Sequence, residues 1–377
     1  MSLYSRRFLL LILWSFTYFS GNVYAYKIDN LELNVNAGAK ETYDDNVTYV
    51  KENRKKDSST TMLLGFDAKY ENALRSLNAS GNIYHQMFNK YTKYDNTSQD
   101  FSLDFKNEFS SRMRLNITDN FLHAYEPRSF EQAFEAVPGR YAYFQNDFGA
   151  IFDADINKRL IGKIKYANST DIFSRADLSD SYLNQGGFGL EYELSELTKL
   201  LVDYDFAERD FSPGNSASAH ILSGGVKTNL NKRLSIEGDV GVDIINSFND
   251  SDYAKPHFKA TVNHDVDEKT MATLSFLKEY STTAYTEDIF NHWQVYAVLK
   301  RQLSRRFDVS LSAFYGEGRY VSSDIHDGLR GANVDLIYNF SEKIKTTLGC
   351  AYSQADSSDS SREYTKNLIS LGLLVQF

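Results

Sequence analysis

The sequence predicts an all-β protein, a transmembrane antiparallel up-and-down β-barrel of about 18 strands with short periplasmic turns and longer outer loops. Three observations lead to this prediction. Apolar and polar residues alternate through most of the chain, turn-like segments recur at a nearly constant interval, and the last strand ends on an aromatic residue. We justify each part below, beginning at the N-terminus.

The first 25 residues are predicted to be a secretory signal peptide. Arg6 and Arg7 precede an apolar run over 8–19, and Val23-Tyr24-Ala25 forms a small-x-small cleavage site. The run is shorter than the roughly 20 residues that a transmembrane helix needs, which argues against a membrane anchor. Residues 26–377 are then expected to form the barrel in the outer membrane of a Gram-negative bacterium.

Composition agrees with a barrel. After residue 25 no stretch approaches 18 consecutive apolar residues, and the chain holds 26 Tyr, 26 Phe and only 4 Pro. Many Tyr and Phe suit the aromatic girdles at the two membrane interfaces. The single Cys350 cannot form an internal disulfide. Loss of Arg6 and Arg7 changes the net charge from −9 to −11, so we expect no nucleic-acid partner.

Short turn-like segments repeat along the chain. From residue 230 onward they recur every 36 or 37 residues, an interval that holds two strands, one tight turn and one longer polar loop. The predicted tight turns are 70–74, 109–113, 156–160, 194–200, 230–234, 266–270, 303–307 and 340–344. The predicted loops are 44–58, 90–96, 125–142, 174–182, 212–217, 247–253, 285–290, 321–327 and 356–363. Seventeen connections give eighteen strands. A periplasmic propeller or solenoid does not account for the last strand.

Alternation within the strands separates a lipid face from a lumen face. In 234–244, Leu234, Val240 and Ile244 lie on one face, whereas Glu237 and Asp243 lie on the other. Because charges are costly in lipid, the acidic face is expected to line a hydrated lumen. The candidate lumen-lining residues are Asp100, Asp104, Glu191, Glu193, Asp203, Asp205, Glu237, Asp239, Asp243 and Asp308, with Lys106, Arg114, Lys163, Lys165 and Lys259 as counter-charges.

The last strand carries Ile369, Leu371, Leu373, Val375 and Phe377 on one face. A terminal Phe on an apolar strand face resembles the signature by which the barrel-assembly machinery recognises bacterial outer-membrane barrels. We therefore expect Phe377 to be the assembly signal and the outer-membrane lipid and lipopolysaccharide to surround the protein. A barrel of sixteen to eighteen strands leaves an aqueous channel.

Two loops are candidate functional segments. Loop 125–142 is the longest connection, and Phe130 and Phe134 stand at helical spacing within it. It either constricts the lumen, through Phe130, Glu131, Phe134, Glu135 and Arg140, or packs on the barrel rim. Loop 44–58 contains Lys51, Arg54, Lys55 and Lys56, which either meet anionic phosphates or glycans or are simply solvated.

The sequence offers no signal for catalysis. The seven His residues are scattered without metal-ligand spacing, and there is no nucleophile elbow, phosphate loop or Cys/His cluster. We expect no enzyme activity, no metal and no cofactor. Trp293 and Tyr296 lie on opposite faces of one predicted strand, so at most one of them can face a solute.

The segment Glu41-Thr42-Tyr43-Asp44-Asp45-Asn46-Val47 resembles the opening strand of a second type of outer-membrane β-barrel porin, whose members accompany exopolysaccharide and capsule synthesis. The resemblance covers the whole mature chain and implies passive export of an exopolysaccharide or capsular polysaccharide for a biofilm matrix, together with periplasmic export components. The alternative is a general or substrate-preferring diffusion porin for small solutes. We expect Asp44, Asp45 and Asn46 to shape a turn rather than to bind a ligand.

Overall fold

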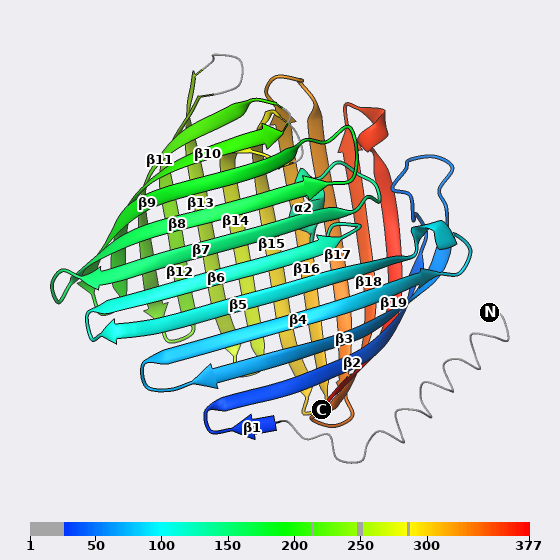
Figure 1. Ribbon diagram of the computed structural model, residues 1–377, viewed down its shortest axis with the longest axis horizontal. Helices are drawn as coiled ribbons and strands as arrows, with labels where there is room; N and C mark the ends of the chain where they lie inside the picture. Colours follow the sequence, from blue (N-terminus) through cyan, green and yellow to red (C-terminus); the bar gives the residue numbers. More distant parts are fainter. Residues whose placement is uncertain (1–25, 213, 247–251, 285–286) are drawn as a thin grey trace.

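The computed structural model describes residues 26–377 except 213, 247–251 and 285–286 (Figure 1). The predicted signal peptide, residues 1–25, lies outside the described part of the chain. The strands are β1 (Tyr26–Ile28), β2 (Leu31–Asp44), β3 (Asp57–Glu71), β4 (Arg75–Phe88), β5 (Asn96–Ser110), β6 (Met113–Ala124), β7 (Tyr143–Asp155), β8 (Leu160–Phe173), β9 (Asp180–Ser195), β10 (Thr198–Ser212), β11 (Ser216–Asn231), β12 (Leu234–Asn246), β13 (Asp252–Asp267), β14 (Thr270–Thr282), β15 (Ile289–Ser304), β16 (Phe307–Tyr320), β17 (His326–Asn339), β18 (Ile344–Ser357) and β19 (Tyr364–Gln376).

The few helical elements are short. Among the described residues, one α-helix, α2 (Phe130–Glu135), and two 3₁₀ turns, η1 (Thr92–Tyr94) and η2 (Ser360–Arg362), lie in the connections. None of the helices in the described ranges has the length and hydropathy to cross a membrane.

The sheet closes on itself. Each strand from β2 onward pairs antiparallel with the next, and β19 pairs back with β2 from Leu368↔Asp44 to Gln376↔Asn36. The amide of Phe377 extends this ladder by donating to the Val35 carbonyl at 2.8 Å. Apart from the short β1, which pairs with β2 from Tyr26↔Leu33 to Ile28↔Leu31, the 19-stranded sheet is a ring of eighteen strands, as predicted (Figure 1).

All eight predicted tight turns join neighbouring strands at one end of the barrel, and the nine loops join them at the other. Short polar side chains set the turns locally. Asn231 Oδ1 accepts from the Arg233 amide at 2.8 Å, and Asp267 Oδ1 accepts from the Lys269 amide at 2.7 Å. Such Asx turns let the chain reverse in two or three residues.

The outer face of the barrel is apolar. Val240 is 61% exposed, Phe188 62% and Leu371 54%, which is the arrangement expected of side chains that meet lipid. Toward the loops the outward rows change to polar residues at the same level on many strands. These residues include Asn146, Asn168, Asn184, Glu208, Glu317, Arg330 and Gln354. This polar ring marks the outer edge of the apolar band.

The lipid face and the lumen face of the sheet should differ in how much a new charge lowers the free energy of unfolding. Val240→Arg, in the middle of the apolar band, should lower the free energy of unfolding by about 2–4 kcal/mol because the cation must enter lipid. Ser310→Arg, whose side chain lines the lumen, should change it by less than about 1 kcal/mol. Urea unfolding in lipid vesicles measures both. Equal effects would contradict the assignment of faces.

Candidate functional site

The predicted carboxylates on β8–β13 lie on the inner face, where basic side chains pair with most of them. Lys165 Nζ lies 2.8 Å from carboxylate oxygens of both Asp203 and Asp205. Glu191 is held between Lys163 at 2.8 Å and Lys199 at 2.5 Å. These contacts cross from strand to strand, so the acidic wall is neutralised locally.

The remaining predicted carboxylates also have polar partners. His257 lies between Asp239 at 3.3 Å and Asp243 at 2.7 Å. Further contacts join Glu237 to Lys227 at 3.2 Å, Asp104 to Lys106 at 3.5 Å, Asp100 to Asn82 at 2.7 Å and Asp308 to Asn339 at 2.9 Å. Glu193 forms no ion pair within the described residues. The wall formed by these residues carries many carboxylates, but much of their charge is compensated.

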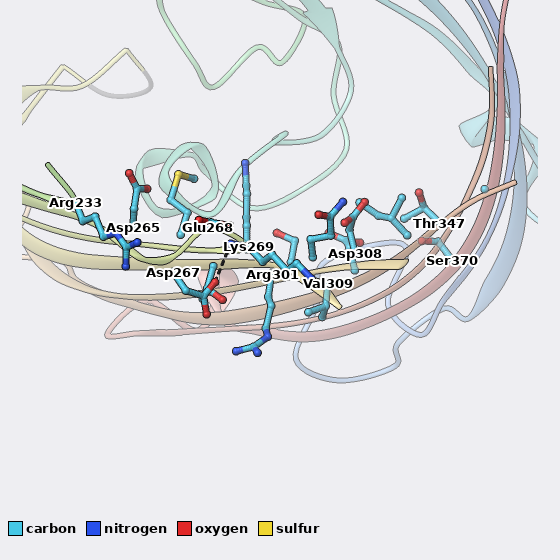
Figure 2. Close-up of a pocket in the computed structure, with 18 of the residues that line it drawn as sticks. Arg233, Asp265, Asp267, Glu268, Lys269, Arg301, Asp308, Val309, Thr347 and Ser370 are labelled. Carbon is cyan, nitrogen blue, oxygen red and sulfur yellow. Dashed lines mark hydrogen bonds between the residues drawn. The ribbon is translucent and has the colours of Figure 1, made fainter. Parts of the chain in front are cut away.

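A cavity of about 1070 Å³ opens at the tight-turn end of the lumen, along the inner wall of β13–β19 and β2. Figure 2 shows Asp308, Thr347 and Ser370 along this wall, while the Arg301 side chain points to the opposite side of the sheet. The acidic lining residues are Asp265, Asp267, Glu268, Asp308 and Asp335, and the basic ones, apart from Arg301, are Lys40, Arg233, Lys269 and Lys300. The vestibule therefore carries both signs of charge.

Loop 125–142 enters the barrel and packs against the far wall. It leaves from β6, returns to β7 and carries α2, whose N-cap Ser129 Oγ accepts from the Gln132 amide at 3.2 Å. Phe134 is 3% exposed, and its ring centroid lies 5.2 Å from that of Phe290 and 5.6 Å from that of Phe314. These partners belong to β15 and β16, about half the ring away from β6 and β7. The loop thus lies across the lumen.

Two glycines on the inner wall make room for this packing. A Cβ at Gly331 would stand 2.4 Å from the Phe130 ring, and one at Gly316 would stand 2.9 Å from the Phe134 ring. Neither close approach is possible with a side chain present. The wall of β16 and β17 is therefore shaped to receive the two phenylalanines of α2.

A buried ionic cluster holds the base of the same loop. Arg140 Nη2 lies 2.8 Å from Glu126 and 3.7 Å from Asp44, and Lys366 Nζ lies 2.9 Å from Asp44 and 3.3 Å from Glu126. Tyr49 donates to Glu126 at 2.8 Å. Asp44 ends β2 and Lys366 lies on β19, so the cluster joins the loop to the seam where the barrel closes.

The neighbours of Asp44 reinforce that seam. Asp45 accepts from the backbone and side-chain amides of Asn367, each at 2.7 Å, and Asn46 Nδ2 donates to the Thr365 carbonyl at 2.9 Å. Asp44 Oδ1 also accepts from the Asn46 amide at 2.9 Å, which is the turn geometry predicted from the sequence. These three residues thus form a turn and also tie β2 to β19.

The ionic cluster lowers the pKa of Glu126, the carboxylate that the loop contributes to it. Burial alone would raise the pKa of Glu126, but Arg140 and Lys366 outweigh it and hold that pKa well below its ordinary range. Glu126 therefore stays charged across the physiological range, and the cluster remains intact.

Glu135, at the end of α2, lies in an environment that raises its pKa instead of lowering it. Enclosure within the barrel raises its pKa to about 7, with Asp171 and Glu131 adding to the rise and Arg209 opposing it. The negative charge of Glu135 also acts on the carboxylate of Glu279 on β14. The loop is thus fixed at its base by charges and carries a titratable group at the end of its helix.

The structure separates the five loop residues singled out in the sequence into two places, the far wall and the ionic cluster. Phe130 and Phe134 face the wall, Glu131 and Glu135 lie on α2, and Arg140 joins the cluster. Sequence reasoning missed the wall that receives the loop, formed by Phe290, Phe314, Tyr320 and Leu329. The available signal was a set of large apolar residues at inward positions of otherwise polar strand faces.

Comparisons with known proteins agree with the fold. The model of the family described as "Putative beta-barrel porin 2" matches residues 256–377, the part of the chain from β13 to the C-terminus. No curated protein sequence matches the chain. The family match over this last third of the chain and the closed eighteen-stranded ring agree with an outer-membrane β-barrel.

Solved structures of two bacterial proteins share the architecture at low sequence identity. A BenF-like porin from Pseudomonas fluorescens Pf-5 is 9% identical, with a TM-score of 0.52 over 93% of this chain and 100% of that one. OccK2 (OpdF) from Pseudomonas aeruginosa is 10% identical, with a TM-score of 0.51 over 93% and 99% of the two chains. At these identities the likeness concerns the fold alone.

The ionic cluster predicts how firmly the loop is held. Arg140→Leu leaves Glu126 and Asp44 with one cation between them, so it should weaken loop docking by about 3–5 kcal/mol. Amide hydrogen exchange over 130–135 should accelerate accordingly. Lys69→Met, which removes an exposed ion pair with Glu71, is the control and should cost less than about 1 kcal/mol. Unchanged exchange in the Arg140 variant would refute the anchoring role.

Glu135 predicts a pH dependence of the same docking. Its pKa of about 7 lies above the ordinary 4.5, so docking is strongest below pH 4.5 and weakens as the pH rises through 7. After correction for intrinsic chemistry, exchange over 130–135 should be faster at pH 8 than at pH 6. Glu135→Gln should abolish this difference. A variant that keeps the full difference would show that another group titrates.

Proposed function

We propose that the protein is a passive outer-membrane porin for small solutes, in which loop 125–142 constricts the lumen. The observation that carries this proposal is the course of the loop. Its helix packs on the wall of β15–β17, while its base is held by Arg140 and Lys366 at the closing seam. Because the loop is fixed at both places, it occupies part of the lumen and leaves a narrower channel than an eighteen-stranded ring without such a loop.

The balance of charge in the lumen supports diffusion of small polar solutes. The acidic wall is compensated by Lys163, Lys165, Lys199 and His257, and the vestibule carries both signs of charge. A solute therefore meets many weak polar partners and no deep apolar trap. Passage needs no catalysis, because a concentration gradient across the outer membrane suffices.

Export of an exopolysaccharide, implied by the resemblance at 41–47, receives less support. A polymer would have to thread past a loop that is docked through two buried phenylalanines and an ionic cluster. The structures that resemble the whole chain include one described as a BenF-like porin. Within the proposal, residues 1–25 direct secretion, Phe377 serves barrel assembly, and lipopolysaccharide surrounds the polar ring.

Loop replacement tests the proposal. Substituting residues 128–138 by a short Gly-Ser linker should raise single-channel conductance severalfold in planar bilayers and admit larger sugars in vesicle-swelling assays. A matched Gly-Ser replacement within loop 89–95, outside the lumen packing described above, should change neither. Equal conductance and equal size exclusion in wild type and in the 128–138 variant would refute the constriction.

A gene deletion separates the two functions. Loss of the porin should slow uptake of small polar solutes and leave secreted polysaccharide unchanged. Loss of extracellular polymer with normal solute uptake would overturn the porin proposal in favour of export.

A further inference from the structure

A narrow slot lies between loop 125–142 and the wall formed by β2–β5, β18 and β19. Its volume is about 250 Å³, below the roughly 300–1,000 Å³ of sites for drug-sized ligands. Lys40, Thr347 and Gly372 line both this slot and the larger vestibule, so the two spaces adjoin. The slot therefore lies beside the loop, next to the vestibule at the tight-turn end.

Two cations in this slot have no carboxylate partner. Lys40 on β2 and Arg128 at the start of the loop form no ion pair with any residue in the described part of the chain. Both side chains are exposed to the lumen. Arg128 lies over the ring of Tyr84, 5.0 Å from its centroid, which fixes the plane of its guanidinium. In an acidic protein, two unpaired cations at one narrow point are unexpected.

The carboxylates around them are already engaged. Glu126 is the only acidic residue that lines the slot, and it pairs with Arg140 and Lys366. Asp335, whose charge also acts on Lys40, accepts from Asn333, and Asp100, beside Tyr84, accepts from Asn82. Neutral amides do not cancel the charges of Asp335 and Asp100, but neither residue lines the slot. Among the described residues that line the slot, only Glu126 opposes Lys40 and Arg128, and Glu126 is already paired in the ionic cluster, so the lining carries a net positive charge.

The rest of the lining is neutral and hydrogen-bonding. Hydroxyl and amide groups are supplied by Thr61, Tyr84, Gln86, Asn96, Ser98, Tyr125 and Thr347. A guanidinium matches the planar geometry of a carboxylate, and an ammonium adds a second charge-assisted contact. The hydroxyl and amide groups suit a ligand whose body carries several hydroxyls.

We propose that this slot binds small hydroxylated carboxylates, such as sugar acids, and passes them into the vestibule. Lys40 and Arg128 neutralise the carboxylate while the surrounding amides and hydroxyls bond the hydroxyl groups. The inference rests on the proposed function, because it names the solutes that the constricted lumen selects.

Calorimetric titration of the full-length mature protein in detergent with gluconate tests the slot, and sorbitol is the uncharged match for gluconate. Gluconate should bind, and sorbitol should bind at least about tenfold more weakly. The double variant Lys40→Gln/Arg128→Gln should lose about tenfold or more in gluconate affinity. Lys259→Gln removes one lumen cation on the opposite wall and should leave the affinity unchanged. Heat-modifiable mobility on gels verifies that each variant is folded.

Four results would each contradict the proposal that the slot binds hydroxylated carboxylates. They are absence of gluconate binding, equal affinity for sorbitol, unchanged gluconate affinity in the double variant, and the same loss of affinity in Lys259→Gln. Conductance in planar bilayers is recorded separately on the same preparations. A conducting channel that does not bind gluconate refutes the slot and leaves the porin. A protein that binds gluconate through Lys40 and Arg128 but does not conduct refutes the porin and leaves the slot.

Discussion

The pairing of β19 with β2 is the interaction on which the structure depends. Backbone groups cannot remain unpaired in lipid, so a membrane-spanning sheet must have no edge. The ladder from Leu368↔Asp44 to Gln376↔Asn36 meets that requirement and continues through Phe377 to the last residue of the chain. Once the ring is closed, the alternation of the strands sends mostly apolar side chains outward into the membrane and mostly polar side chains into the lumen.

Closure of the barrel also creates the site that holds the base of loop 125–142. Asp44 and Lys366 come together only because β2 and β19 are neighbours, and their charges then hold Glu126 and Arg140. The same seam thus completes the barrel and positions the segment that narrows it. On the far wall, small residues such as Gly331 admit the aromatic rings of α2. Closure of the barrel and placement of the loop are in this way two consequences of one contact.

Much of this could be predicted from the sequence, because alternation and turn chemistry are local. The turn at Asn231 and the outward row through Val240 depend on a few neighbouring residues, and both were predicted correctly. The ionic cluster was not predicted, since Asp44 and Lys366 are far apart in the chain and meet only on closure. Likewise, nothing local shows that Phe314 would receive a loop from the other side of the ring.

Cross-linking of the loop to the wall tests the central claim most directly. In a Cys350→Ser background, Ala133→Cys places one thiol on α2 and Leu329→Cys places another on β17. Both residues belong to the hydrophobic cluster in which α2 packs against the wall. A short bis-maleimide should join them in intact outer membranes and leave both conductance and sugar-size exclusion unchanged, because the conducting state already has the loop across the lumen. Failure to cross-link, or loss of conductance once the loop is fixed, would contradict the account.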